Sequence, residues 1–190
     1  MAKRNLLPLL SLLLLFLEGC GTSHYYVLST PSQPQRIYQG LKESVGVEKV
    51  AVPKYLFKRE IAIATSSSER LFLPHALWAE DIEEGLTRRV IHFLQKKFHS
   101  PEIYSYPWGV EQQPLLIVKI ELTRFIVQEK KVYLDASVYI ENTDTSRHKA
   151  TLFSTVVPVS EESASGMVEG MDSAFALLEN RVAEMVRRFK

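Results

Sequence analysis

This 190-residue chain holds few groups with the types and spacing that catalysis or metal binding requires. The five histidines are scattered, with no H-E-x-x-H motif and no close histidine pair that also has a carboxylate in ligand spacing. Asp81, Glu83 and Glu84 could form an acid–base pair, but they lie at the expected start of a helix, where carboxylates stabilise the helix dipole. No phosphate-binding glycine loop or G-x-S-x-G motif is present. The sequence therefore predicts that the protein is not an enzyme, and it predicts no cofactor and no metal site.

Cys20 is the only cysteine of the chain, and it directly follows an apolar run. Lys3 and Arg4 precede the apolar residues 6–17, and small residues surround the cysteine, as in a secretory signal peptide. The run is shorter than the roughly 20 residues of a membrane-spanning helix. A lone cysteine in a secreted chain has no internal disulfide partner. The alternatives are a buried free thiol and a disulfide between two chains, but we expect a lipid attachment site.

Residues 17–20, Leu-Glu-Gly-Cys, resemble the bacterial lipobox. That resemblance implies that Cys20 receives diacylglycerol on its sulfur and, after cleavage, an acyl chain on its amino group. We therefore expect a lipoprotein signal peptide at residues 1–19 and a single domain at residues 20–190. Gly21 rather than aspartate follows the cysteine, which favours the outer membrane, with the domain facing the periplasm. The four residues before the first expected strand span at most about 14 Å, which places the domain close to the membrane.

The overall composition excludes some partners. Lysine and arginine number 23, aspartate and glutamate 22, and the net charge is +1. This balance gives no electrostatic reason to expect nucleic acid as a partner. The length after the expected cleavage site suits one domain with one core.

Several short segments rich in β-branched and aromatic residues predict strands. We expect strands at residues 25–29, 44–53, 60–65, 70–73 and 149–159. The third and fourth of these are separated by a serine-rich turn and predict a hairpin. Residues 101–114 are expected to form a loop.

Two segments have apolar residues every three or four positions, which is the spacing of one helical face. The first helix is expected from residue 74 to about 98, with Trp78 and Ile82 on its apolar face. Its basic residues, including Arg89, are interpreted as part of a solvated outer face rather than a binding patch. The second helix is expected to begin within three residues of Val168.

Residues 115–142 predict two long antiparallel strands. A three-residue turn at 129–131 sets Leu122 opposite Val138, whereas a two-residue turn sets charged residues opposite apolar ones, so we predict the three-residue turn. The side chains expected to pack inward are Leu116, Val118, Ile120, Leu122, Ile126, Leu134, Ala136, Val138 and Ile140. The reverse face is expected to carry Thr123, Phe125, Tyr133, Asp135, Ser137 and Tyr139.

Together these elements predict an α/β (α+β) fold, a two-layer sandwich. Its sheet is mixed but mostly antiparallel, and both amphipathic helices pack on one face of it.

The chain resembles the PqiC-like family of ABC-type transport auxiliary lipoproteins. The resemblance rests on Tyr-Tyr-Val-Leu at 25–28, Val-Pro-Lys-Tyr-Leu at 52–56, Trp-Ala-Glu-Asp-Ile at 78–82, and Arg124 with Phe125. Small and apolar residues at 171–186 resemble the closing helix of the family. The order and spacing of these segments match over nearly the whole mature chain.

This resemblance implies an outer-membrane lipoprotein that works with an MCE-domain protein of the PqiB type, anchored in the inner membrane. The MCE protein would form a tunnel across the periplasm for lipids, and the lipoprotein would dock its outer end. A ring-like homo-oligomer would match the rotational symmetry of such a tunnel.

The candidate partner-binding residues are exposed aromatic and apolar side chains, which commonly anchor interfaces. They are Tyr55, Leu56, Phe125, Tyr133 and Tyr139. The alternative interpretation places Trp78, Tyr55 and Leu56 in the core and leaves the reverse sheet face half covered by a loop.

Two other function classes stay open at this point. One is an assembly or plug lipoprotein of an outer-membrane barrel complex, which uses a similar helix-on-sheet architecture. The other is an enzyme, which a pocket with a converging carboxylate and histidine would favour.

Overall fold

The computed structural model describes residues 22–28, 30, 32–38, 40–110 and 113–189. The strands are β1 (His24–Tyr26), β2 (Val45–Val47), β3 (Glu60–Ala64), β4 (Arg70–Trp78), β5 (Ile103–Ser105), β6 (Leu116–Gln128), β7 (Lys131–Asn142) and β8 (His148–Pro158). The helices are the 3₁₀ helix η1 (Lys54–Phe57) and the α-helices α2 (Ile82–Phe98) and α3 (Ala164–Arg187).

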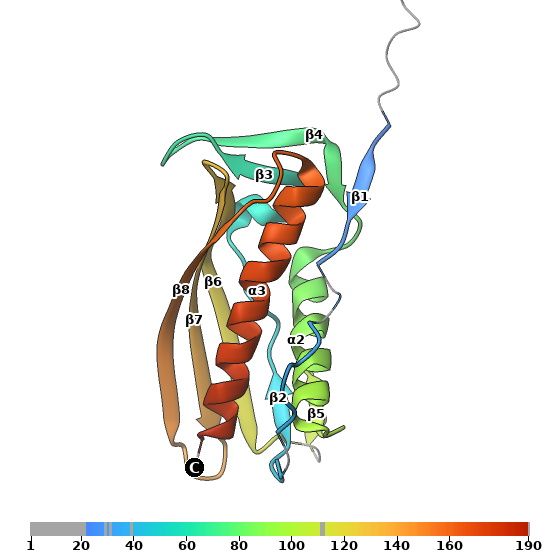
Figure 1. Cartoon of the computed structure of the whole chain (residues 1–190). Coiled ribbons are helices and arrows are strands. Elements are labelled where there is room, and N and C mark those ends of the chain that lie inside the picture. Colours follow the sequence, from blue (N-terminus) through green and yellow to red (C-terminus); the bar gives the residue numbers. More distant parts are fainter. Residues whose placement is uncertain (1–21, 29, 31, 39, 111–112, 190) are drawn as a thin grey trace, which may run out of the picture.

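The eight strands form one mixed sheet, and α2 and α3 lie side by side on one face of it (Figure 1). This arrangement confirms the predicted two-layer α/β fold. The described chain begins beside β1 and β4, and its C-terminus lies at the opposite end of the molecule (Figure 1).

Strand β6 organises the sheet. On one edge it pairs with β7 along its length, and β7 pairs with β8, both antiparallel. The other edge of β6 is shared by β2, which pairs in parallel with its first residues, and β3, which pairs in parallel with its last. Strand β5 lies outside β2, while β4 and then β1 lie outside β3. The longest pairings are therefore antiparallel, and the short ones are mostly parallel.

The turn between β6 and β7 has two residues, not the predicted three. Gln128 pairs with Lys131, and the intervening Glu129 and Lys130 both have positive φ, 49° and 58°. Positive φ at both central residues is the geometry of a type I′ hairpin turn, whose twist matches that of the strands. The predicted turn was wrong because it assumed one register along the whole hairpin.

A β-bulge between Leu122 and Arg124 changes that register by one residue. Before the bulge, Leu122 pairs with Ala136 instead of the predicted Val138, but the predicted inward-facing residues of that half are buried. Beyond the bulge the two faces of β6 are exchanged, while Leu134 of β7 lies in the main core as predicted. Phe125 packs in the main core, whereas Ile126 packs with Ala62 and Ala64 on the other side of the sheet.

Helix α2 begins at Ile82, so the predicted start at residue 74 was wrong. Residues 74–78 continue β4, in which Trp78 lies opposite Tyr26 of β1. Asp81 caps the helix, since its side chain accepts a hydrogen bond from the backbone N–H of Glu84 at 3.1 Å. Strand pairing on two sides of β4 therefore outweighs the helical spacing of Trp78.

Two further boundaries differ from the predictions. Helix α3 begins at Ala164, just before the predicted window, because Ser163 caps it by accepting a hydrogen bond from Gly166 N–H at 3.1 Å. Strand β5 lies within residues 101–114, which were expected to form a loop. It is only three residues long, too short for a periodic pattern, and among the described strands it pairs only with β2.

The main core lies between the helices and the sheet. Phe175 of α3 and Phe125 of β6 are both fully buried, with ring centroids 6.1 Å apart. Gly170 allows α3 to approach β7 closely, because a Cβ at this position would lie 2.9 Å from Cγ2 of Val132. This packing fixes α3 on the sheet.

Candidate functional site

The predicted signal peptide and Cys20 lie outside the described residues, so lipidation of Cys20 stays a prediction. The chain joins the sheet at His24, four positions after Cys20. There β1 pairs in parallel with the end of β4, and the backbone N–H of Ala79 donates to the carbonyl of Tyr26 at 2.8 Å. The chain is therefore part of the folded domain from His24 onward, only four positions after Cys20.

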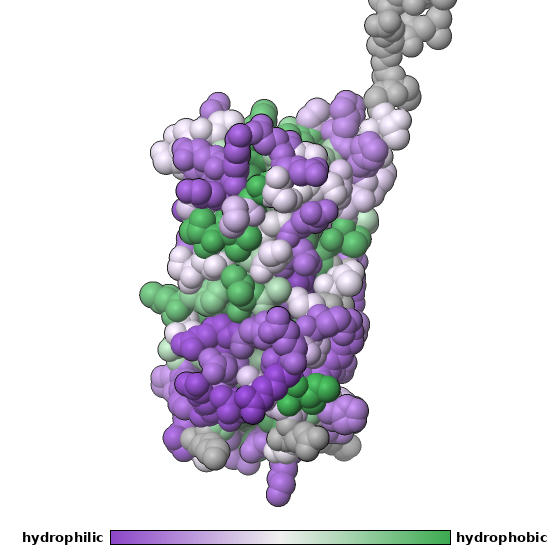
Figure 2. Space-filling view, viewed as in Figure 1, coloured by the Kyte–Doolittle hydropathy of each residue, from purple (hydrophilic) through white to green (hydrophobic). Residues whose placement is uncertain are grey.

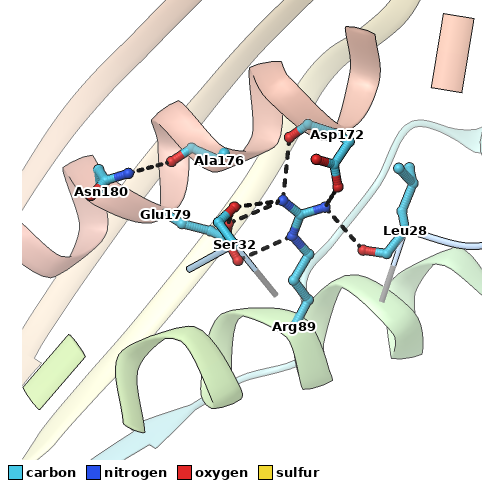
Figure 3. Close-up of polar contacts among 7 residues, drawn as sticks. All are labelled: Leu28, Ser32, Arg89, Asp172, Ala176, Glu179 and Asn180. Atoms are coloured by element: carbon cyan, nitrogen blue, oxygen red, sulfur yellow. Dashed lines mark hydrogen bonds and ion pairs between the residues drawn. The ribbon is translucent and has the colours of Figure 1, made fainter. Parts of the chain in front are cut away.

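A buried ion pair between the two helices lies directly behind this N-terminal segment (Figure 3). Arg89 of α2 and Glu179 of α3 are both 0 % exposed. Nε and Nη2 of Arg89 donate to the two carboxylate oxygens of Glu179, each at 3.1 Å. Two such bonds in parallel are the strongest geometry for a guanidinium–carboxylate pair.

Residues from three parts of the chain complete this site, which we name the Arg89 cluster: Leu28, Ser32, Arg89, Asp172 and Glu179. Nη1 of Arg89 donates to Asp172 Oδ1 at 2.5 Å and to the carbonyl of Leu28 at 3.2 Å. Ser32 accepts from Nη2 at 3.1 Å and donates to Glu179 at 2.8 Å. Figure 3 shows these groups converging on the guanidinium. All five N–H groups of Arg89 thus have acceptors.

The electrostatics of the cluster favour a structural role. Burial raises the pKa of Glu179, although Arg89 and the hydroxyl of Ser32 oppose that shift. Removing one partner of a buried pair leaves the other charge unpaired, which is strongly destabilising. Because Arg89 and Glu179 have no exposed surface, they cannot reach a substrate. The cluster instead fastens Leu28 and Ser32 of the N-terminal segment to both helices.

The sequence did not identify this cluster, since Arg89 was assigned to a solvated outer face. That interpretation was wrong for Arg89 and also for Lys97, which is buried. A signal was nevertheless present. Arg89 lies three and four positions from Leu86 and Phe93, so helical periodicity places its charge on the apolar stripe.

Of the five predicted partner-binding residues, two are buried and three are half-buried. Leu56 and Phe125 are buried in the main core, so the expectation that they lie on the surface was wrong. Tyr55 is half-buried, and its hydroxyl accepts a hydrogen bond from the backbone N–H of Phe125 at 2.9 Å, next to the bulge. Burial raises the pKa of Tyr55, which keeps the hydroxyl protonated. The structure brings these three residues together as packing partners.

The other two, Tyr133 and Tyr139, lie on the sheet face away from the helices. The guanidinium of Arg124 lies 3.9 Å from the ring centroid of Tyr133, and His148 stacks on Tyr139 at 5.4 Å. Both tyrosines are half-buried by such neighbours. Their role in partner binding stays a prediction.

In the described part of the chain, no group of three or more histidine, cysteine, aspartate or glutamate side chains is arranged to hold a metal ion. Among the same residues, no helix combines the length and the apolar composition needed to span a bilayer.

Comparisons with known structures support the fold. An uncharacterized protein of known crystal structure has a TM-score of 0.70 and 19% sequence identity, covering 87% of this chain and 99% of its own. Protein XCC0632 from Xanthomonas campestris has a TM-score of 0.64 and 12% identity, covering 88% of this chain and 94% of its own. At these identities, the likeness concerns the fold alone. A comparison of the sequence with curated proteins finds no match.

A family model described as the ABC-type transport auxiliary lipoprotein component matches residues 26–183, which is most of the chain. This family is a component of transport systems rather than a family of enzymes, and its members are membrane-associated lipoproteins. The protein therefore belongs to the family of ABC-type transport auxiliary lipoproteins.

Proposed function

We propose that the protein is an outer-membrane lipoprotein, anchored through Cys20 and facing the periplasm. In this role it docks the outer end of an MCE-domain protein that is anchored in the inner membrane. The two proteins then form part of an ABC-linked route for lipids between the membranes. Family membership together with the short connection between Cys20 and β1 is the observation that carries the proposal.

The connection from the anchor to the domain supports a docking role. The four residue steps from Cys20 to His24 reach at most about 14 Å. The Arg89 cluster then holds Leu28 and Ser32 against both helices. A domain attached in this way keeps a fixed distance from the bilayer, so a partner docked on it delivers cargo across a short gap.

The sheet face away from the helices is the surface that we assign to the partner. Among the described strands, β8 pairs only with β7. On this face Leu152 of β8 is 87% exposed, and Val156 and the rings of Tyr133 and Tyr139 lie on the same side of the sheet. On the helix-covered side, by contrast, apolar residues form separate patches divided by hydrophilic ones (Figure 2). The reverse face therefore offers the better anchors for an interface.

The anchoring step is tested by labelling cells with a palmitate analogue. The wild-type chain is expected to take up the label and to fractionate with the outer membrane, while Cys20→Ser is expected to lose the label and remain soluble in the periplasm. A Cys20→Ser chain that still carries the label would contradict lipidation at this residue.

The docking step is tested with a photo-crosslinking amino acid at Leu152. The matched control position is Leu177, which is 49% exposed on α3. Crosslinks to an MCE-domain protein are expected from position 152 and not from position 177. Capture of a barrel protein instead would favour the plug or assembly role. Crosslinks between two copies of the chain would identify this face as the contact of a ring-like homo-oligomer.

A further inference from the structure

A pocket of about 320 Å³ lies between η1 and the segment that connects β4 to α2. Residues 56–59 form one wall, and residues 78–83 form the other. The pocket adjoins β1, since Ala79 N–H bonds to the carbonyl of Tyr26, and the guanidinium of Arg59 lies 5.9 Å from the ring centroid of Tyr25. It is therefore located where the chain arrives from Cys20.

Two residues that line this pocket each bury a polar atom that has no hydrogen-bond partner within the described part of the chain, Nε1 of Trp78 and Oε1 of Glu80. Trp78 is only 2% exposed. Buried polar groups are nearly always bonded, so such atoms call for an explanation. An indole N–H can only donate, and a carboxylate oxygen can only accept. A group that satisfies both atoms must carry an acceptor and a donor.

The charges around the pocket are divided between its two walls. In the described part of the chain, neither Lys58 nor Arg59 forms an ion pair, and the N-terminus of α2 adds its partial positive charge. On the opposite wall the acidic groups are mostly engaged. Oε2 of Glu80 pairs with Arg88, and Glu83 pairs with Lys49 at 3.0 Å. Among the described residues, Asp81 forms no ion pair either, but its side chain caps α2. The charged groups that have neither an ion pair nor a capping role are thus Lys58 and Arg59, and Oε1 of Glu80 is the unbonded carboxylate oxygen.

We propose that this pocket binds a phosphate joined to a primary ammonium, the chemistry of the phosphatidylethanolamine head group. The phosphate accepts from Lys58, Arg59 and Trp78. The ammonium donates to Oε1 of Glu80. Trp78 Nε1 and Glu80 Oε1 are shielded from solvent, so the head group enters by displacing side chains at the rim, where Lys58 and Phe57 are exposed.

The position of the pocket indicates that the head group comes from a lipid of the bilayer. This step rests on the proposed anchoring through Cys20. The five steps from Cys20 to Tyr25 span at most about 18 Å. Phe57 and Tyr25, which are 57% and 58% exposed, flank the pocket with apolar surface suited to the interfacial region of a membrane.

The probe of binding is the fluorescence of Trp78. The chain has two tryptophans, so Trp108→Phe leaves Trp78 as the only emitter. The full chain in an uncharged detergent is titrated with glycerophosphoethanolamine and, separately, with glycerophosphocholine. The two ligands have the same charges, but the trimethylammonium group has no N–H to donate. We expect saturable binding of the first and affinity lower by about tenfold or more for the second, since one charge-assisted hydrogen bond is lost.

Matched variants locate the site. Lys58→Gln and Arg59→Gln are expected to weaken binding by about tenfold each, whereas Lys54→Gln, on η1 but outside the pocket wall, leaves it unchanged. Glu80→Gln is expected to weaken binding, while Glu84→Gln, on the first turn of α2 but outside the wall, does not.

The outcomes separate this site from the proposed anchoring. Three results would overturn the inference: equal affinity for the two head groups, inorganic phosphate binding as tightly as glycerophosphoethanolamine, or no change in Trp78 fluorescence with any ligand. Each of these results is independent of whether Cys20→Ser loses its label. A response to phosphatidylethanolamine but not phosphatidylcholine vesicles identifies the lipid as the source. A response to the soluble group alone supports the same site with a free small molecule as its ligand.

Discussion

The two polar sites along α2 differ in how completely their groups are bonded. In the Arg89 cluster, every N–H of a fully buried guanidinium has an acceptor, and the contacts join three distant parts of the chain. Just before the same helix, Trp78 and Glu80 bury a donor and an acceptor that have no partner among the residues that the structure describes. A saturated cluster can only hold the fold together. An unsaturated one retains the capacity to bind something else.

The largest expected effect comes from breaking the saturated cluster. Arg89→Met leaves Glu179 buried and unpaired, and we expect the free energy of unfolding to fall by about 3–5 kcal/mol. Urea unfolding followed by circular dichroism measures the loss. Arg88→Met, which removes an exposed neighbour, is expected to cost less than about 1 kcal/mol. The double variant Arg89→Met/Glu179→Leu is expected to regain most of the stability, and a double variant as unstable as Arg89→Met would contradict this account.

The pH dependence of stability tests the same cluster without a substitution and is expected to have a smaller effect than Arg89→Met. Because burial raises the pKa of Glu179 above its ordinary value of 4.5, the folded state holds this proton more strongly than the unfolded state. The stabilisation from this more tightly held proton is fully present below pH 4.5 and is lost as the pH rises through the raised pKa. Over that range the free energy of unfolding falls by at most about 1.4 kcal/mol per pH unit. Unfolding curves over this range measure the slope. An unaltered slope in Glu179→Gln would assign the effect to another group.

Ser32→Ala removes the hydroxyl contacts that join the N-terminal segment to both helices and leaves the bond from Arg89 to the Leu28 carbonyl in place. The hydroxyl makes two hydrogen bonds, so we expect a loss of about 1 kcal/mol. Hydrogen exchange is expected to speed up at residues 32–38 and to stay unchanged in β7, which contributes no residue to the cluster. Unchanged exchange in the N-terminal segment would show that the cluster does not fasten it.

The smallest expected effect is at the unsaturated site. Glu80→Gln loses one exposed ion pair with Arg88 and no buried hydrogen bond, so the free energy of unfolding is expected to change by less than about 0.5 kcal/mol. Thermal unfolding of Glu80→Gln and Arg89→Met under the same conditions compares the two losses of stability. A loss as large as that of Arg89→Met would mean that both sites are structural.

The sequence predicted the elements better than their contacts. Most strands and both helices follow from local spacing, and the family follows from motifs that lie in order along the chain. The hairpin register did not follow, because one bulge beside Leu122 changes it. Next to this bulge, the hydroxyl of Tyr55, about 70 residues earlier in the chain, accepts a hydrogen bond from the backbone N–H of Phe125. Similarly, Trp78 has helical spacing but lies in a strand, because β1 and β3 pair with β4 on both sides.

The sequence by itself determined the two-layer class, the family and the single cysteine as the expected point of attachment, because each of these is written in composition and local order. Only the tertiary structure decided that Arg89 meets Glu179, that Phe125 is core, and that Trp78 and Glu80 share a pocket. The physical reason is that burial and hydrogen-bond saturation depend on which distant segments come into contact, and neither residue type nor periodicity specifies that contact.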